Sequence, residues 1–131
     1  MTISEVSQRT GITQDTLRYY ERIGLIPKVK RRPNGIRDYS EEDCRWIELA
    51  RCMRSAGVTI EALIEYCVLA QKGDATITAR KELLMEEREN LTAKIEEMQR
   101  ALERLHYKIQ RYEEAEKTGI LSWERKAVRA L

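Results

Sequence analysis

The stretch Thr13-Gln-Asp-Thr-Leu-Arg-Tyr-Tyr-Glu-Arg-Ile-Gly-Leu-Ile-Pro27 decides the fold of the first half of this chain. Thr13 has the hydroxyl side chain that helix N-caps favour, and Leu17, Tyr20 and Ile23 then recur at helical spacing. Pro27 cannot continue a helix. The sequence therefore predicts an amphipathic helix that begins after Thr13 and is ended by Pro27.

A shorter helix precedes this one. Thr2 is suited to cap it, Gly11 is suited to end it, and Ile3 and Val6 share one of its faces. Ile12 would then pack at the corner. Two short helices joined by a turn that contains glycine predict a helix-turn-helix, whose second helix directs its N-terminal residues toward DNA base edges.

The second helix carries the first candidate DNA-binding residues. Gln14, Thr16 and Arg18 are expected to reach base edges, and Tyr19 is expected to contact a phosphate. Tyr20 is a further candidate, although its place on the apolar stripe of the helix favours the core. Because helix-turn-helix patterns also arise in proteins that do not bind DNA, the segment alone leaves both readings open.

A basic run follows this helix, with no acidic residue between Lys28 and Arg37. Within it, Asn34-Gly35 predicts the two-residue turn of a β-hairpin in which both residues take positive φ. The cations would face DNA phosphates while the apolar positions pack inward, at Val29, Ile36 and Tyr39. A solvated basic loop is the alternative, but the position directly after a helix-turn-helix favours a wing.

Two more helices are expected before residue 75. Ser40 and the acids after it predict the start of a third helix that ends at Gly57, with an apolar face at Trp46, Ile47, Leu49, Ala50 and Met53. Thr59 is suited to cap a fourth helix that closes at Gly73, with apolar residues at Ile60, Leu63, Ile64, Cys67 and Val68. The segment 57–59 would form a second, smaller wing near Arg51 or Arg54.

From about Thr78 the apolar residues alternate steps of four and three, which is typical of a coiled coil. The seam consists of Leu84, Leu91, Ile95, Met98, Leu102, Leu105, Ile109 and Tyr112, with Arg88 as its polar member. A helix over 78–116 would extend about 60 Å at ~1.5 Å per residue, more than a small domain can cover. We therefore expect a homodimer; a helix folded back on the N-terminal domain is the alternative.

The C-terminal residues complete a mainly α fold. Ile120, Leu121, Trp123, Val128 and Leu131 recur at roughly helical spacing and predict a short C-terminal helix that packs against the dimer. The predicted organisation is a winged helix-turn-helix domain over 1–75, a long dimerising coiled-coil helix over 76–118, and a short tail over 119–131.

The order and spacing of three motifs resemble the MerR family of bacterial transcription regulators. These are Arg18-Tyr19-Tyr20-Glu21-x-x-Gly24-Leu25-Ile26, then Asn34-Gly35-x-Arg37-x-Tyr39, then Gly57-Val58-Thr59. The resemblance implies a homodimer with an antiparallel coiled coil that binds a pseudo-palindromic operator in double-stranded promoter DNA. It also implies that the dimer bends and untwists an overlong promoter spacer, and so acts on RNA polymerase indirectly. By position it implies DNA contacts at Thr13, Thr16, Arg18, Tyr19, Arg37, Tyr39 and Arg54.

The positions of the cysteines limit which signals such a dimer is expected to sense. Metal-responsive members of the family carry cysteines at the two ends of the coiled-coil helix, whereas Cys44, Cys52 and Cys67 all precede it. We therefore expect neither a metal site nor a cofactor. Multidrug-sensing members append a large ligand-binding domain, and the few residues after Gly119 are too short to form one.

Cys52 is the expected redox sensor. It lies between Arg51 and Arg54, and nearby guanidinium groups favour the reactive thiolate. The segment 51–57 also looks like the branch of the family that responds to aldehydes, nitrosothiols and other electrophiles through one cysteine. The alternatives are a sensor at Cys44 or Cys67, three thiols that only fill space, or an effector that does not act on thiols.

Composition excludes several other classes. With one His, no nucleotide-binding glycine loop and no nucleophile elbow, the chain lacks the residues of an enzyme. There is no signal peptide and no apolar run long enough for a membrane, so we expect a cytoplasmic protein. A coiled-coil protein-interaction module is the remaining rival, and the basic wing argues against it. The net charge of only +2 means that DNA affinity would come from locally placed cations.

Overall fold

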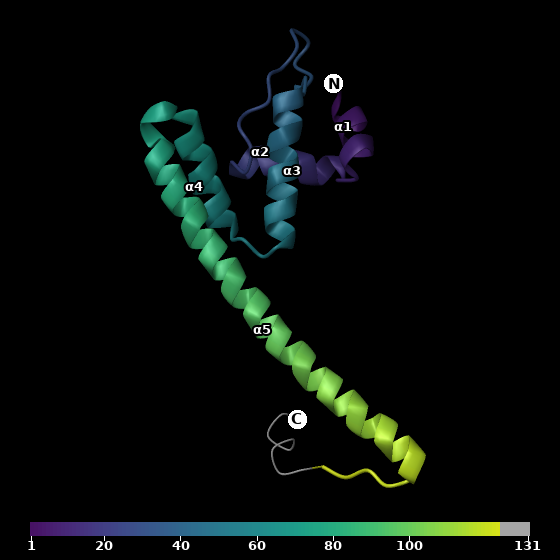
Figure 1. The fold of residues 1–131 in the computed structure, drawn as a ribbon. Helices are drawn as coiled ribbons and strands as arrows, with labels where there is room; N and C mark the ends of the chain where they lie inside the picture. Colours follow the sequence, from purple (N-terminus) through teal and green to yellow (C-terminus); the bar gives the residue numbers. More distant parts are fainter. Residues whose placement is uncertain (124–131) are drawn as a thin grey trace. The chain divides into compact units, whose positions relative to one another are not determined.

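The computed structural model describes residues 1–123, and within them it is mainly helical (Figure 1). The elements in order are α1 (Ile3–Thr10), α2 (Gln14–Ile23), α3 (Glu41–Ser55), α4 (Ile60–Gln71), the 3-10 turn η1 (Asp74–Thr76) and α5 (Ile77–Thr118). The chain separates into two compact units, Met1–Arg88 and Glu89–Leu131. Their boundary falls inside α5, whereas the sequence placed a domain boundary at residue 75. Across residues 1–123 no helix is long and apolar enough to cross a membrane.

The first four helices begin where their capping residues predict. Thr2, Thr13, Ser40 and Thr59 each accept a hydrogen bond through the side chain from a backbone N–H in the first turn of the helix. At Ser40 the arrangement is reciprocal, because Asp43 N–H donates to Ser40 Oγ at 3.0 Å while Ser40 N–H donates to Asp43 Oδ2 at 2.9 Å. These contacts satisfy N–H groups that have no partner within the helix.

The turn between α1 and α2 requires a glycine. Gly11 has a φ of 75°, in the left-handed region, and its N–H donates to Ser7 O at 2.9 Å. Thr10 and Ile12, on either side of it, are both buried. The geometry of the helix-turn-helix thus depends on one αL residue, Gly11, between two buried neighbours.

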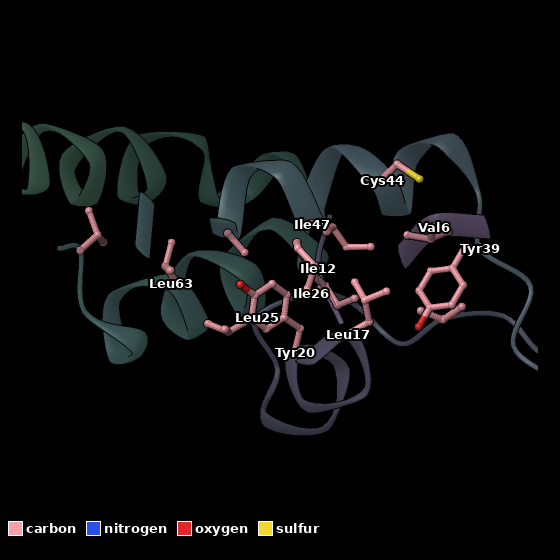
Figure 2. Packing of buried hydrophobic residues seen from close by; sticks show 13 residues of the cluster. Val6, Ile12, Leu17, Tyr20, Leu25, Ile26, Tyr39, Cys44, Ile47 and Leu63 are labelled. Carbon is pink, nitrogen blue, oxygen red and sulfur yellow. The ribbon is translucent and has the colours of Figure 1, made fainter. Parts of the chain in front are cut away.

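One hydrophobic core holds the helices of the first unit together (Figure 2). Val6 of α1, Leu17 of α2 and Ile47 of α3 have no exposed surface, and Ile26 follows α2 into the same cluster. Leu63 of α4 closes the cluster. Because the apolar stripe of α2 faces this core, its opposite face is left exposed in a fixed orientation.

The predicted wing is present, but its turn differs from the prediction. The two arms pair through one antiparallel bridge, Arg31 with Arg37, and Arg32 N–H donates to Ile36 O at 2.8 Å. Asn34 does not have positive φ; among these residues only Gly35 does, at 85°. A hydrogen bond of 2.8 Å from Gly35 N–H to Arg32 O closes the turn. The loop is therefore a turn over 32–35 whose last residue is an αL glycine, not a turn with two positive-φ residues.

Several other expectations are corrected. α2 ends at Ile23, with Gly24 as its C-cap, so Pro27 lies in the following loop. Ile36 was expected to pack inward but is 53% exposed at the wing. α5 ends before Gly119, as predicted, but residues 120–123 are not helical. The rest of the predicted C-terminal helix, including Val128 and Leu131, lies outside the described residues.

Candidate functional site

The N-terminal half of α2 presents a row of polar side chains away from the core. Thr13 Oγ1 is 2.9 Å from Thr16 Oγ1 and accepts the Thr16 N–H at 3.2 Å. Arg18 extends back along the helix, donating to Asp15 Oδ1 at 3.0 Å and to Gln14 Oε1 at 3.4 Å. The candidate readers are thus assembled on one exposed surface. Their mutual contacts lie at the solvent side, where a ligand with hydrogen-bonding edges can replace them.

Tyr19 lies farther along the same helix and is more exposed than the other tyrosines near it. The guanidinium carbon of Arg22 sits 5.4 Å from the centre of the Tyr19 ring, a cation–π contact. This contact holds a hydroxyl and a cation together next to the candidate readers. Arg22 was not among the sequence candidates, although its position four residues after Arg18 places both on one helical face.

A hollow of about 630 Å³ lies between α2 and the wing. It is lined by Arg18, Glu21, Arg22, Lys28, Val29, Arg31 and Arg37. Five of these seven residues are cationic and one is acidic, so the hollow suits an anion such as a backbone phosphate. The structure therefore brings together cations that are separated by up to nineteen positions in the sequence, from Arg18 to Arg37.

The acidic residue of the hollow joins its two walls. The Glu21 carboxylate accepts hydrogen bonds from Val29 N–H at 2.8 Å and from Arg37 Nε at 2.6 Å. The Glu21 side chain is only 10% exposed and that of Arg37 is 23% exposed. The sequence motif contains Glu21 but gives no sign of this partner, because the contact depends on how the wing folds back on α2.

Three other candidates have contacts within the protein. Tyr20 and Tyr39 are buried in the hydrophobic core, with Tyr39 only 2% exposed (Figure 2). Burial raises the pKa of the Tyr39 hydroxyl. Arg54 donates through Nη1 to the Val58 carbonyl oxygen at 2.7 Å and so closes the loop between α3 and α4. Burial supports a scaffolding role for Tyr20 and Tyr39, whereas Arg54 is exposed and stays a candidate for DNA contact.

The three cysteines differ in exposure. Cys52 is exposed on α3, whereas Cys44 and Cys67 are buried. Burial raises the pKa of both the Cys44 and the Cys67 thiol, which keeps them in the unreactive protonated form. No cluster of metal-ligating side chains occurs among residues 1–123.

The arginines that flank Cys52 donate hydrogen bonds to backbone carbonyl oxygens. Arg51 donates to the carbonyl oxygen of Thr10 and to the Glu48 carboxylate, and Arg54 donates to Val58 as described. The two arginines that flank Cys52 in the sequence thus anchor α3 to neighbouring turns. Any change at Cys52 acts next to these anchors.

The α5 seam presents its apolar side chains to solvent. About half or more of the surface is exposed at Leu84, Ile95, Met98, Leu102, Leu105, Ile109 and Tyr112. Leu84 also lines a hollow of about 390 Å³ with Tyr66 of α4 and Ile77 of α5. An exposed apolar stripe of this length is typical of a helix that packs against another apolar surface.

Comparison with known proteins agrees with this arrangement. Residues 1–68 match the model of the MerR HTH family regulatory proteins. The chain is 58% identical over 91 residues to the HTH-type transcriptional regulator AdhR of Bacillus subtilis, a match that covers 70% of this chain and 65% of AdhR.

Two solved structures are also similar. A protein described as a MerR family transcriptional regulator from Listeria monocytogenes superposes with a TM-score of 0.85 at 49% identity, covering 86% of both chains. HiNmlR, described as a MerR family regulator lacking the sensor domain and bound to promoter DNA, gives a TM-score of 0.80 at 30% identity. That match covers 92% of this chain and 95% of HiNmlR.

Proposed function

Because the chain belongs to the MerR family of DNA-binding transcription regulators, we propose that it binds promoter DNA as a homodimer and changes the shape of the promoter spacer. The observation that carries the proposal is the basic hollow between α2 and the wing, next to the exposed N-terminal half of α2. A capped helix that presents polar side chains beside a cluster of cations suits a duplex, which has base edges in its groove and phosphates along its rim.

In this proposal Gln14, Thr16 and Arg18 contact base edges. Thr13 and Tyr19 contact the phosphate backbone beside them. Tyr20 and Tyr39 support the surface from the core without reaching the duplex, in keeping with their burial. The division assigns sequence discrimination to α2 and salt-dependent affinity to the hollow.

The second copy is proposed to pair along α5. In a parallel pair each Arg88 would lie opposite the Arg88 of the other copy, and two like charges would meet in an apolar seam. An antiparallel pair avoids this by placing Arg88 opposite Leu105. The same register matches Leu84 with Ile109 and Leu91 with Leu102. Antiparallel helices would hold the two α2 surfaces apart on one duplex, as two half-sites of a pseudo-palindromic operator require.

The proposed effect on transcription is deformation of the spacer. A dimer that binds two half-sites in a bent and untwisted duplex changes the relative orientation of the promoter elements that RNA polymerase contacts. The polymerase would thus be affected through the DNA, without a direct contact. Activation and repression both follow from this scheme, according to which DNA shape the dimer stabilises.

Cys52 is proposed as the switch. Its exposure makes it the accessible thiol of the three, and it neighbours Arg51, which anchors α3 to the turn before α2. In the proposed step the Cys52 thiolate attacks the carbonyl carbon of an aldehyde. A carbon–sulfur bond forms, the C=O π electrons move to oxygen, and water protonates that oxygen. The added group would displace α3 and with it the angle between the two α2 surfaces.

The test is transcription in vitro from the promoter region of the chain's own gene, with wild type and Cys52→Ser compared with and without an electrophilic aldehyde. We expect both proteins to bind the DNA in a gel shift that weakens strongly with salt, and only wild type to respond to the aldehyde. Absence of DNA binding by wild type would refute the proposed function. A response of Cys52→Ser equal to that of wild type would refute only the thiol switch.

A further inference from the structure

We propose that Glu21, although acidic, is a positioning residue that strengthens DNA binding by holding Arg37 in place for a backbone phosphate. The inference rests on the proposed function and deepens it, because it concerns how one phosphate contact of the α2 and wing surface is built. It begins with a conflict: a carboxylate beside a bound phosphate should repel it, yet Glu21 lines the hollow in which five cations converge.

The contacts of Glu21 resolve the conflict. One carboxylate oxygen accepts the Val29 N–H at 2.8 Å, and the other accepts Arg37 Nε at 2.6 Å. Val29 is buried at the beginning of the wing, and Arg37 lies on its returning arm. A single side chain of α2 therefore ties both arms of the wing to the reading helix.

The atom that Arg37 uses in this contact determines what remains for DNA. The hydrogen bond to Glu21 comes from Nε, and within residues 1–123 no hydrogen bond from Arg37 Nη1 or Nη2 is present. The guanidinium is a rigid planar group, so fixing its Nε edge also fixes the direction of its other N–H groups. Arg37 lines the hollow, where those groups are available to a phosphate oxygen.

Burial makes this a fixed arrangement rather than a transient surface pair. The Glu21 side chain is 10% exposed, in contrast to Asp15, whose side chain is 97% exposed and pairs with Arg18 on the same helix. Exposed ion pairs hold their partners weakly, whereas a largely buried carboxylate with two donors holds a defined geometry. Glu21 and Asp15 therefore allow a matched comparison. Both are acids on α2 that pair with an arginine, but only the Glu21 side chain is largely buried.

The role of Glu21 can be tested by whether its replacement strengthens or weakens DNA binding, with Asp15 as the comparison. Glu21→Gln and Asp15→Asn each remove one negative charge close to the proposed DNA surface. If charge alone mattered, both would tighten DNA binding. If Glu21 positions Arg37, then Glu21→Gln weakens binding by about tenfold, as expected for loss of a charge-assisted hydrogen bond, while Asp15→Asn does not weaken it.

The experiment measures binding of the full chain by fluorescence anisotropy over a range of salt concentrations. The probes are a duplex from the promoter region of its own gene and a scrambled duplex of equal length. We expect Glu21→Gln to lower the salt slope by about 0.9, as Arg37→Gln also should, because one phosphate contact is lost on either duplex. A partly unfolded variant would lose active protein without changing this slope. The double variant should bind no more weakly than Arg37→Gln alone.

The outcomes separate this inference from the proposed function. If wild type binds neither duplex, the proposed function fails and the inference with it. If wild type binds but Glu21→Gln binds equally well or more tightly, only the role of Glu21 is overturned. Should Glu21→Gln fail to fold, Arg37→Lys replaces it: this variant keeps the charge and loses the Nε donor, and unchanged affinity and slope would likewise overturn the inference.

Discussion

Arg51 of α3 donates a hydrogen bond to the carbonyl oxygen of Thr10, the residue that ends α1. Thr10 is buried, and its hydroxyl is itself bonded to Val6 O at 2.8 Å. The turn that orients α2 is therefore anchored to the same helix that carries Cys52, one residue beyond Arg51. A displacement of α3 would therefore move this turn and change the orientation of α2.

Replacing Arg51 should measure this anchor. In Arg51→Met the Thr10 carbonyl loses a charged hydrogen-bond donor, and we expect the free energy of unfolding to fall by about 1 kcal/mol. This value is small for a hydrogen bond from a charged group because Arg51 is partly exposed to solvent. Urea denaturation followed by circular dichroism measures the change. Arg45→Met, an exposed arginine on the same helix, is the control and should change stability by less than about 0.5 kcal/mol. Equal losses in the two variants would show that the hydrogen bond to Thr10 contributes nothing specific.

The reactivity of the cysteines should follow their burial. Because Cys52 is exposed while burial raises the pKa of the Cys44 and Cys67 thiols, one thiol per chain should react rapidly with a chromogenic disulfide reagent under native conditions. The other two should react only after unfolding. Cys52→Ser should abolish the rapid phase, and Cys44→Ser should leave it intact. A rapid phase that persists in Cys52→Ser would contradict the structure.

Tyr39→Phe should stabilise the fold slightly. The Tyr39 hydroxyl is buried and, within residues 1–123, has no hydrogen-bond partner, so its removal spares a desolvation cost of about 1 kcal/mol. Thermal unfolding of Tyr39→Phe beside Tyr20→Phe measures the gain. DNA affinity should stay the same, because the ring lies in the core. If a stable Tyr39→Phe variant bound DNA more weakly, the result would support the DNA contact at Tyr39 that the family resemblance implies.

The ion pair between Arg9 and Glu41 predicts a pH dependence. Both guanidinium–carboxylate distances are 2.8 Å, and the hydrogen bonds from Arg9 lower the pKa of Glu41. A carboxyl whose pKa is lower in the folded state contributes stability above its ordinary pKa, and loses that contribution as pH falls through the folded value. The urea midpoints of wild type and Glu41→Gln should therefore differ at neutral pH and converge in acid. Glu42→Gln, also in the first turn of α3, controls for the helix dipole; an equal pH-dependent difference there would exclude the ion pair as its cause.

How far the sequence predicted this structure depends on the range of the interactions. Thr2, Thr13, Ser40 and Thr59 cap their helices through bonds to residues three positions away, so local sequence is sufficient to predict them. Gly11 is equally local, since its αL conformation is a property of its own backbone. These signals, with apolar periodicity, are enough to predict the helices and most of the core.

The candidate site was predicted less completely, because it depends on contacts across the chain. Arg37 was expected to face DNA freely, and nothing near it in the sequence indicates that Glu21, sixteen residues earlier, binds its Nε. Ile36 and Tyr39 were both expected to pack inward, but they are three positions apart, and such residues of an extended arm point to opposite sides. Tyr39 is buried, and Ile36 is exposed. Tyr39 matched a family motif, but the motif does not distinguish a contact from a core residue that supports one.

Arg88 offers the last prediction, because it interrupts an otherwise apolar seam. A single polar residue in such a seam specifies pairing direction at a cost in stability. Arg88→Leu should therefore raise the melting temperature of the dimer while making parallel pairing less unfavourable. Thermal unfolding at two protein concentrations measures the first effect.

Pairing direction can be read from disulfides in a background without the native cysteines. A bond between copies carrying Leu84→Cys and Ile109→Cys reports antiparallel pairing, and a bond between two copies of Leu84→Cys reports parallel pairing. With Arg88 present we expect only the first bond; with Arg88→Leu we expect both. If Arg88→Leu lowers the melting temperature, or if copies of Leu84→Cys join each other while Arg88 is present, then Arg88 does not select the antiparallel arrangement.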